Sequence, residues 1–493
     1  MADFSYHRRP THQVNVGQTV IGGDNPVIIQ TMTNTSTLDT EATVQQIARC
    51  VDVGASIVRM TAQGVSHARN LAAIRKQLDA LGVKVDLVAD IHFNPAAAYE
   101  AALHVEKVRI NPGNFVDPGR VFKKIEYSDE EYASELLRLK NAFEPFLELC
   151  RKNCTAIRIG VNHGSLSDRI MSRYGDTPLG MVESAMEFLR IARENHFDNI
   201  VISIKASNVI VMTETVELLA ETMANEGMTY PLHLGVTEAG DGEDGRVKSA
   251  VGIGTLLLSG IGDTIRVSLS EAPEAEIPVA REILRQVETI ADSHEIYSLT
   301  ENDTPIDASL PKPYVLGLDT AVKAGKLYSF SFEPGISLDE LIIAASIRIG
   351  WTLLNREVDG IEIIAPGFTS ETINNLVLNI LQATRKRITK TEYIACPGCG
   401  RTLFDLSTTL KSVREATSHL KGLKIGVMGC IVNGPGEMAD ADYGYVGGAK
   451  DKVSLYRGKE CVMKNLPAEE AIAHLVDLIK NDGRWVDPGE SNE

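Results

Sequence analysis

Eight short apolar runs between residues 26 and 270 constrain the fold of this chain more than any other feature of its sequence. Each run has a β-rich composition, ends near a polar or charged residue, and is followed by a loop and a helical stretch. The runs span residues 26–30, 56–60, 85–89, 105–110, 156–161, 199–204, 231–236 and 263–267. Strands that alternate with helices in this way form parallel sheets. We predict a (β/α)8 TIM barrel, with a doubly wound open sheet as the alternative, because counting runs does not prove closure.

The C-terminal ends of barrel strands face one mouth, where the sites of such proteins are built. Five residues at these run ends are basic: Arg59, Arg109, Arg158, Lys205 and Arg266. The other polar residues there are Asp90, His92, Asn111, Asn162, Ser207, His233, Thr237, Glu238 and Ser268. Because buried like charges repel, five converging cations indicate a bound anion. Arginine donors match phosphate oxygens in pairs, and this number of donors favours a diphosphate.

A competing interpretation is that each basic residue pairs with a local acid at the barrel rim, where such pairs are common and contribute little stability. Asp90 and Glu238 are the only acids among the run-end residues, too few to neutralise five cations. Glu238 is instead a candidate proton donor. His92 and His233 are equally compatible with satisfied core histidines, since no carboxylate or metal partner is identified for either from the sequence.

Three of the seven cysteines lie in two turns rich in Gly and Pro near the C-terminus. Cys396 and Cys399 belong to the first turn, and Cys430 is followed seven positions later by Glu437 in the second. Three thiolates and a carboxylate form a four-ligand set. A structural zinc site usually takes four Cys or a mixture of Cys and His, and a redox-active dithiol would not need Cys430. An iron–sulfur cluster held by three cysteines leaves one iron for an oxygen ligand. All three interpretations stay open on spacing alone.

These turns resemble the signature of the 4-hydroxy-3-methylbut-2-enyl diphosphate synthase family, the iron–sulfur enzymes of the non-mevalonate isoprenoid pathway. The resemblance includes residues 396–401 and 428–440 and the pair Gly447-Gly448. It extends to the N-terminal half at residues 30–35, 88–92 and 109–114. It covers roughly residues 12–288 and 387–480, which is most of the chain.

The resemblance implies reductive ring opening of 2-C-methyl-D-erythritol 2,4-cyclodiphosphate, with loss of water, to an allylic diphosphate. It implies that Cys396, Cys399 and Cys430 hold a [4Fe-4S] cluster and that Glu437 occupies the remaining iron until substrate displaces it. The five cations would hold the diphosphate, the other run-end residues would add contacts, and Glu238 would deliver a proton. The electron donor would be a ferredoxin or flavodoxin, since the chain has no flavin or nicotinamide motif. The competing function is a zinc-containing TIM-barrel hydrolase or lyase acting on a phosphorylated metabolite.

We predict three parts: a barrel domain at residues 1–288, a middle insert at 289–386 and a cluster domain of α+β type at 387–493. The insert opens with Pro305, Pro311 and Pro313. Residues 350–363 of the insert echo residues 254–267 at a constant offset of 96 positions, which indicates a degenerate barrel fragment. The family closes its site across a homodimer in its short form, whereas an insert could let one chain close on itself. The sequence leaves both arrangements open.

Length and composition exclude several classes of protein. A chain of 493 residues with 44% hydrophobic and 23% charged residues is globular and has two or three domains. It contains no run of about 18 apolar residues that could span a membrane, and its N-terminus lacks an apolar export segment. Seven cysteines make no disulfide framework, which favours a reducing cytoplasm. A net charge of −17 argues against nucleic acid or an anionic membrane as partner.

Overall fold

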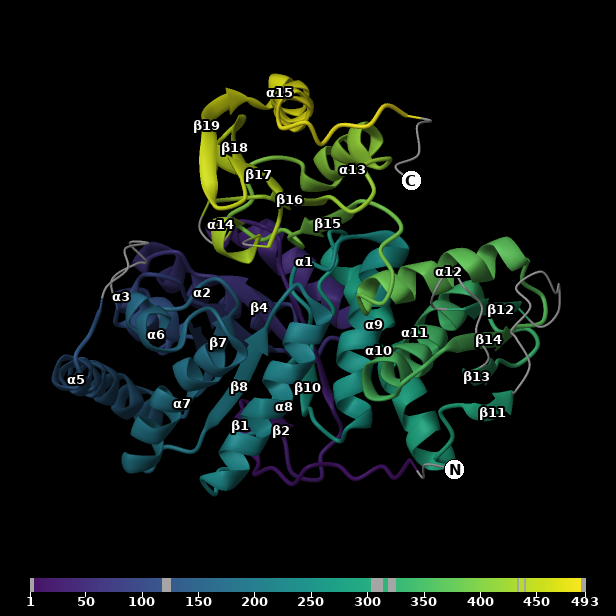
Figure 1. Cartoon of the computed structure of the whole chain (residues 1–493). Helices are drawn as coiled ribbons and strands as arrows, with labels where there is room; N and C mark the ends of the chain where they lie inside the picture. The colour runs from purple at the N-terminus through teal and green to yellow at the C-terminus, as the bar shows by residue number, and fades with distance from the viewer. Residues whose placement is uncertain are drawn as a thin grey trace.

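The computed structural model describes residues 4–117, 126–302, 314–317, 325–431, 434–438 and 440–488. The three linker prolines of the insert lie outside these residues, as do Val432, Asn433 and Ala439 of the motif region. The chain forms a barrel, a smaller α/β unit beside it and a C-terminal unit above the barrel mouth (Figure 1). None of the helices in the described ranges combines the length and the apolar character needed to cross a membrane.

The barrel is an eight-stranded parallel sheet with the order β8-β7-β6-β5-β4-β3-β10-β9. Its strands are β3 (Ile28–Met32), β4 (Ile57–Thr61), β5 (Asp86–Asp90), β6 (Lys107–Ile110), β7 (Ala156–Asn162), β8 (Ile200–Lys205), β9 (His233–Leu234) and β10 (Thr264–Ile265). A parallel bridge between Ile202 and Leu232 joins the two ends of this order. The ring is therefore closed, which confirms the predicted TIM barrel and excludes the open doubly wound sheet.

Helices surround the barrel and cover the outer faces of its strands. They are α1 (Thr40–Asp52), α2 (Val65–Ala80), α3 (Pro95–Ala101), α4 (Pro112–Phe115), α5 (Asp129–Asn153), α6 (Asp168–Tyr174), α7 (Pro178–Glu194), α8 (Val209–Asn225), α9 (Gly242–Leu258) and α10 (Pro273–Ser293). An antiparallel hairpin of β1 (Val14–Val16) and β2 (Thr19–Ile21), absent from the sequence prediction, packs its buried residues against Ile57, Val88, Ala156 and Val201. The hairpin therefore packs against residues of β4, β5, β7 and β8.

The long helix α5 shows how local sequence sets an element boundary. It begins at Asp129 and runs to Asn153. Ser128 forms a capping box in which its hydroxyl accepts from the amide of Glu131 and the Glu131 carboxylate accepts from the amide of Ser128. This reciprocal pair satisfies two of the amides that a helix start leaves unpaired, so the helix begins there.

The middle unit is a four-stranded mixed sheet with two helices. The strand order is β11-β13-β14-β12, and the β13–β14 pair is parallel. The elements are β11 (Ser298–Asn302), β12 (Tyr314–Gly317), β13 (Gly325–Ser331), α11 (Leu338–Asn355), β14 (Gly360–Ile364) and α12 (Ser370–Ala383). Helix α11 packs against α9 and α10 of the barrel (Figure 1). The middle unit and the barrel therefore share one hydrophobic core.

The C-terminal unit is a five-stranded mixed sheet with the order β15-β16-β17-β18-β19. Its elements are β15 (Glu392–Ala395), α13 (Leu406–Thr417), β16 (Lys424–Met428), α14 (Gly434–Glu437), β17 (Tyr443–Ala449), β18 (Lys452–Arg457), β19 (Glu460–Pro467) and α15 (Ala468–Asn481). The predicted α+β organisation of this part is present, although strand β19 was not expected. The domain boundaries after residues 288 and 386 stay predictions.

The C-terminal unit rests on the barrel mouth of the same chain. Ala395 at the end of β15 forms a parallel bridge with Ala239, which follows β9. Two strands further around the mouth, after β7, a Cβ added at Gly164 would lie 2.0 Å from the carbonyl oxygen of Gly436. Only glycine permits backbones to approach this closely. The chain thus closes its barrel mouth with its own C-terminal unit, the arrangement that the sequence left undecided.

Candidate active site

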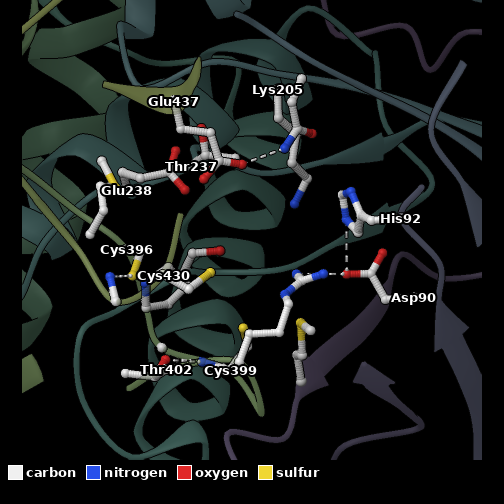
Figure 2. Close-up of a pocket in the computed structure, with 18 of the residues that line it drawn as sticks. Asp90, His92, Lys205, Thr237, Glu238, Cys396, Cys399, Thr402, Cys430 and Glu437 are labelled. Atoms are coloured by element: carbon white, nitrogen blue, oxygen red, sulfur yellow. Dashed lines mark hydrogen bonds and ion pairs between the residues drawn. The ribbon is translucent and has the colours of Figure 1, made fainter. Parts of the chain in front are cut away.

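A cavity lies where the barrel mouth meets the two cysteine turns, which we call the first cysteine loop (residues 396–402) and the second cysteine loop (residues 428–437) (Figure 2). Most of the predicted site residues line it together. From the barrel these are Arg59, Asp90, His92, Arg109, Arg158, Asn162, Lys205, Thr237, Glu238, Arg266 and Ser268. From the cysteine loops they are Cys396, Cys399, Cys430 and Glu437. Two regions that are far apart in sequence therefore form one site.

Two of the five predicted cations have a buried acidic partner. Arg109 donates from Nη1 to Oδ1 of Asp90 at 3.1 Å. Arg266 donates to both carboxylate oxygens of Glu276 on α10, at 2.9 and 3.1 Å. For Arg266 the local ion pair, which was the competing interpretation, is therefore correct. Glu276 was missed because it lies on a helix ten positions further along the chain, not at a strand end.

The other three cations, Arg59, Arg158 and Lys205, have no acidic partner among the residues that the structure describes. Arg158 and Lys205 are buried at the barrel mouth and Arg59 is half-buried there. The Nε and Nη1 atoms of Arg158 lack any hydrogen-bond partner in the described parts of the chain. Burial and the neighbouring guanidinium groups lower the pKa of Arg158, and burial lowers that of Arg59 to about 10. A buried cation without an ion-pair partner is costly, so this group of side chains could accept an anion in the cavity.

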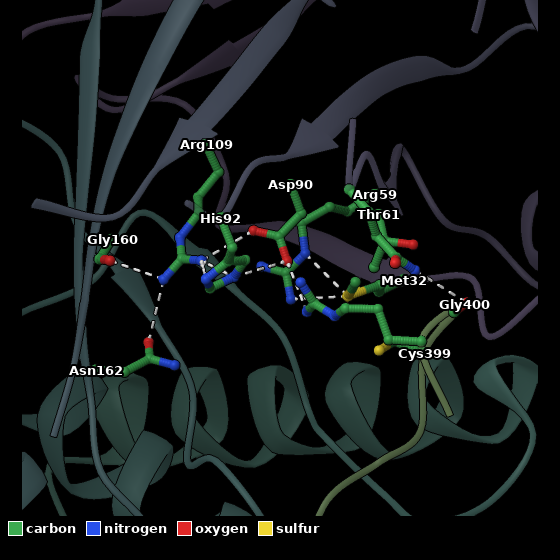
Figure 3. Close-up of polar contacts among 12 residues, drawn as sticks. Met32, Arg59, Thr61, Asp90, His92, Arg109, Gly160, Asn162, Cys399 and Gly400 are labelled. Carbon is green, nitrogen blue, oxygen red and sulfur yellow. Dashed lines mark hydrogen bonds and ion pairs between the residues drawn. The ribbon is translucent and has the colours of Figure 1, made fainter. Parts of the chain in front are cut away.

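His92 is a neutral hydrogen-bond acceptor in this arrangement. Burial and the adjacent Arg109 lower the pKa of His92 to about 3, although Asp90 opposes the shift. Arg109 donates from Nη1 to Nε2 of the ring, and Nε2 lies 3.5 Å from Oδ2 of Asp90 (Figure 3). Arg109 also donates to the carbonyl oxygen of Gly160 at 2.8 Å. The guanidinium is thereby held in one orientation beneath the cavity.

A chain of polar side chains crosses from the barrel to the second cysteine loop. Arg109 donates from Nη2 to Oδ1 of Asn162 at 3.4 Å, and Asn162 donates from Nδ2 to Oε1 of Glu437 at 2.6 Å. Glu437 in turn contacts Glu238, and burial together with this carboxyl neighbour raises the pKa of Glu238 well above its ordinary value. Glu238 also has a left-handed backbone, with φ of 51°. Strain of this kind at a non-glycine residue gathers at functional sites.

The cysteine loops present their sulfur atoms toward the same cavity. The amide of Gly429 in the second cysteine loop donates to Sγ of Cys396 in the first at 3.3 Å, so the two loops are joined by a hydrogen bond to this sulfur. The amide of Cys399 donates to Oγ1 of Thr402 at 3.0 Å, which fixes the turn between Cys399 and Thr402. Ser270 of the barrel donates to the carbonyl oxygen of Cys396 at 2.8 Å. The first cysteine loop is thus anchored to the barrel as well as to its partner loop.

The donor set fits an iron–sulfur cluster better than a single ion. Three thiols and one carboxylate face the cavity, and an amide already donates to one of the sulfur atoms. Across the described ranges no group of three or more His, Cys, Asp and Glu side chains is arranged to hold one metal ion. A structural zinc ion would draw four ligands to within about 2.3 Å of a single centre. A cluster binds each thiolate to a different iron and so accepts a wider ligand set.

Three predicted binding residues do not line the cavity. Asn111 caps α4, accepting from the amide of Gly113 and donating to Oγ of Ser165 at 3.1 Å. His233 is buried deeper in the barrel, where burial and Lys205 lower its pKa well below the ordinary value. Ser207 is buried beyond the end of β8 and is also absent from the cavity lining. The structure offers no support for substrate contacts by these three side chains.

The chain is similar to known proteins over nearly its whole length. A family model described as the GcpE TIM-barrel domain matches residues 11–281, and one described as the GcpE protein C-terminal domain matches residues 392–481. A Parabacteroides distasonis protein named 4-hydroxy-3-methylbut-2-en-1-yl diphosphate synthase (flavodoxin) is 47% identical, over 99% of this chain and 100% of that protein. Proteins with the same name from Bacteroides thetaiotaomicron and Akkermansia muciniphila are 46% and 42% identical, over 97% and 98% of this chain and 98% of each of those proteins.

The chain belongs to the GcpE family. The two GcpE models leave residues 282–391 uncovered, which includes the whole middle unit. The alignment with the Parabacteroides protein extends over 610 positions, whereas this chain has 493 residues. That GcpE relative therefore carries residues that this chain lacks, consistent with a member of the family whose insert is shortened.

In this GcpE protein the cavity also contains residues that the sequence reasoning missed. Arg401 and Met32 both line it. Arg401 lies 3.7 Å from Oδ2 of Asp90, and Met32 accepts from Nε and Nη2 of Arg59 at 3.1 and 3.0 Å. Burial alone would lower the pKa of Arg401, but Cys399 and Asp90 outweigh burial and raise it. The position of Arg401 directly after the Cys-x-x-Cys-Gly motif was the available signal.

Proposed function

We propose that this chain converts 2-C-methyl-D-erythritol 2,4-cyclodiphosphate to 4-hydroxy-3-methylbut-2-enyl diphosphate, by reductive opening of the ring and loss of water. The observation that carries the proposal is the shared cavity: buried cations without counter-charges and three cysteines with a carboxylate line the same space. The curated relatives are named as this synthase, and they align with this chain over nearly their whole lengths. Each half of the cavity then has a defined task.

The barrel half would bind the diphosphate. Arg59, Arg158 and Lys205, which lack acidic partners in the described parts of the chain, would contribute most of the binding energy. A buried guanidinium gains most when it meets a doubly charged oxygen group in a site without bulk water. Arg109 and Arg266 already pair with acids, so they would contribute donors more than net charge. Ser268 and Thr237 would add neutral hydrogen bonds from the rim.

The C-terminal half would hold a [4Fe-4S] cluster through Cys396, Cys399 and Cys430, with Glu437 on the remaining iron. When bound, the cluster supplies the electrons of the reaction and a Lewis-acidic iron for a substrate oxygen. The amide of Gly429 would donate to the Cys396 thiolate and stabilise its negative charge. Asn162 would orient the Glu437 carboxylate as the fourth ligand through the hydrogen bond that it donates.

Glu238 would deliver the proton that the departing hydroxyl needs. Its raised pKa favours the protonated carboxyl, whose hydroxyl can donate to Glu437. Burial makes deprotonation of Glu238 more costly than in water. The proton would therefore pass to a strongly basic acceptor, such as the leaving oxygen. Because the C-terminal unit covers the barrel mouth, the proton would not exchange freely with bulk water during the reaction.

The electron donor would be a flavodoxin, as the names of the curated relatives state for those proteins. Closure of the mouth by the same chain means that a dimer would not be needed to complete the cavity. The division into a barrel, an insert and a cluster domain with boundaries after residues 288 and 386 is part of this proposal. The insert would carry no reacting group and would support the barrel helices that face the C-terminal unit.

Anaerobic purification followed by iron and sulfide analysis and a turnover assay tests this function. We expect about four irons and four sulfides per chain, an absorption band typical of thiolate-bound iron, and conversion of the cyclic diphosphate with reduced flavodoxin. A protein that binds zinc alone, or a loaded cluster without any conversion of this substrate, would reject the proposal. Cys430→Ala provides the control, since it removes one ligand and should prevent stable cluster loading.

A further inference from the structure

Arg401 connects the two halves of the cavity, yet neither the proposed diphosphate contacts nor the proposed cluster ligands account for it. It lies two positions after Cys399 in the first cysteine loop, and its side chain is only 8% exposed. A long charged side chain that is almost fully buried needs specific partners. Arg401 has them on both sides, one in the barrel and one in its own loop.

On the barrel side, Arg401 lies 3.7 Å from Oδ2 of Asp90 at the end of β5. The other oxygen of the same carboxylate accepts from Arg109 at 3.1 Å. Asp90 is therefore shared between a barrel cation and a cation of the first cysteine loop. Of the ion pairs formed by the described residues, this is the one that joins a cysteine loop to a barrel strand. Its formation requires the C-terminal unit to be docked on the mouth.

On the other side, the Arg401 guanidinium lies near the side chains of Cys399 and Cys430, which line the same cavity and raise its pKa. Asp90 and Cys399, the two residues that it contacts, are labelled in Figure 3, one from the barrel and one from the first cysteine loop. A positive group beside the sulfur ligands of a cluster stabilises the added negative charge of the reduced state. The effect is large where water is excluded, because the effective dielectric constant is low.

We propose that Arg401 is a positioning residue with two linked effects: it holds the C-terminal unit on the barrel through Asp90, and it raises the reduction potential of the cluster through Cys399. The first effect needs only the folded chain. The second rests on the proposed function, since it requires the cluster. Domain closure and readiness for reduction then depend on the same side chain, so the cluster is most easily reduced when the mouth is covered.

Amide hydrogen exchange of the chain without cluster tests the closure effect. In Arg401→Met and Asp90→Asn we expect the amides of the first cysteine loop, among them Cys399 and Thr402, to exchange about tenfold faster than in the unchanged protein, because local opening becomes more favourable. Arg457→Gln is the matched control, because Arg457 is exposed and pairs with Asp482 within the C-terminal unit. It should leave exchange in the first cysteine loop unchanged.

A reductive titration of the anaerobically loaded protein, followed by electron paramagnetic resonance, tests the electrostatic effect. Each step adds one electron to the cluster and oxidises the dithionite titrant. We expect Arg401→Met to make reduction about tenfold less favourable, which corresponds to a fall of about 59 mV for a one-electron couple. Asp90→Asn removes a negative charge and should leave the potential equal or raised. Arg401→Lys keeps the charge and should restore most of the potential.

The two arms separate this inference from the function on which it partly rests. If the loaded protein fails to convert the cyclic diphosphate but both shifts appear, the proposed function fails and the role of Arg401 stands. If Arg401→Met exchanges and titrates like the unchanged protein, the inference is wrong, even when turnover falls. If Arg401→Met does not fold, Asp90→Asn and Arg401→Lys still decide it: unchanged loop exchange in Asp90→Asn, together with a lowered potential in Arg401→Lys, would overturn it.

Discussion

Two helix–strand units of this molecule share a layout but differ in chemistry. In the barrel, α9 (Gly242–Leu258) leads into β10 (Thr264–Ile265), and in the middle unit α11 (Leu338–Asn355) leads into β14 (Gly360–Ile364). The sequence echo at an offset of 96 residues coincides with this layout, since both echoing segments start inside the helix and end at the strand. The weak repeat therefore corresponds to a repeated structural unit.

The two units pack against each other in a nearly symmetric way. A Cβ added at Gly254 of α9 would lie 2.6 Å from Ile347 of α11, and one added at Gly350 of α11 would lie 2.8 Å from Val251 of α9. Gly254 and Gly350 correspond at the same offset, and so do Val251 and Ile347. Each helix thus uses a glycine to admit a branched side chain of the other, as in a contact between two copies of one surface.

The difference between the units lies at the strand ends. Arg266 after β10 lines the cavity and pairs with Glu276, whereas Glu362 at the corresponding position accepts from the hydroxyl of Ser329 on β13. The two units thus share the packing of α9 against α11. They differ in the residue at the corresponding strand position, which is a cation in the barrel, next to the cysteine loops, and Glu362 in the middle unit. Four predictions test how far packing and chemistry are separate.

The largest expected effect is on turnover. Arg158→Met should lower kcat/KM at least about a hundredfold, since a charged hydrogen bond to phosphate contributes about 1.5–3 kcal/mol and Arg158 has several free donors. Glu362→Gln in the middle unit should leave kcat/KM within about twofold, as expected for a change remote from the site. Steady-state assays of the loaded variants measure both. Equal losses in the two variants would mean that the middle unit takes part in the chemistry.

The second effect concerns proton delivery in the barrel. Glu238→Gln should lower kcat by about 10²–10⁴-fold, the usual contribution of a general acid. Because burial and Glu437 raise the pKa of Glu238, the unchanged enzyme should stay active above the ordinary pKa of a carboxyl and lose kcat as pH rises through that raised value. A pH profile of kcat checks the sign. An unaltered alkaline limb in Glu238→Gln would assign the proton to another group.

The third effect tests the symmetric packing. Gly254→Ala and Gly350→Ala should each lower the free energy of unfolding by about 1–3 kcal/mol, because overpacking outweighs the helical preference of alanine. Urea unfolding measures both variants. Val251→Ala should offset part of the loss in Gly350→Ala, since it removes the methyl groups that the added Cβ would meet. A stabilised Gly350→Ala protein would contradict the close approach of α9 and α11.

The smallest effect lies where α9 meets the chain after the middle unit. Lys390 pairs with Asp244 at 2.5 Å, and the partly exposed pair should contribute at most about 1 kcal/mol. Burial would raise the pKa of Asp244, but Lys390 outweighs it and lowers that pKa. The contribution is therefore present above the unfolded-state pKa and lost as pH falls through the lowered value. Urea unfolding of Asp244→Asn at neutral and acidic pH should show a difference that shrinks in acid.

Most of the barrel could be predicted because a strand buried on both sides leaves a strong local signal. The predicted run at 156–161 corresponds to Ala156–Asn162, and the run at 199–204 to Ile200–Lys205. The short strands β9 and β10 were predicted too long, since their apolar neighbours continue past the last ladder bonds. The N-terminal hairpin was missed because two strands of three residues carry almost no periodicity.

The sequence by itself determined the succession of barrel strands and helices, the polar residue at each of these strand ends and the cysteine loops, because these follow from spacing along the chain. Only the tertiary structure decided which cations stay without a counter-charge. Glu276 neutralises Arg266 from a neighbouring helix, and Arg401 reaches Asp90 from more than three hundred residues away. Pairing of buried charges depends on distances in space, and no local pattern encodes those.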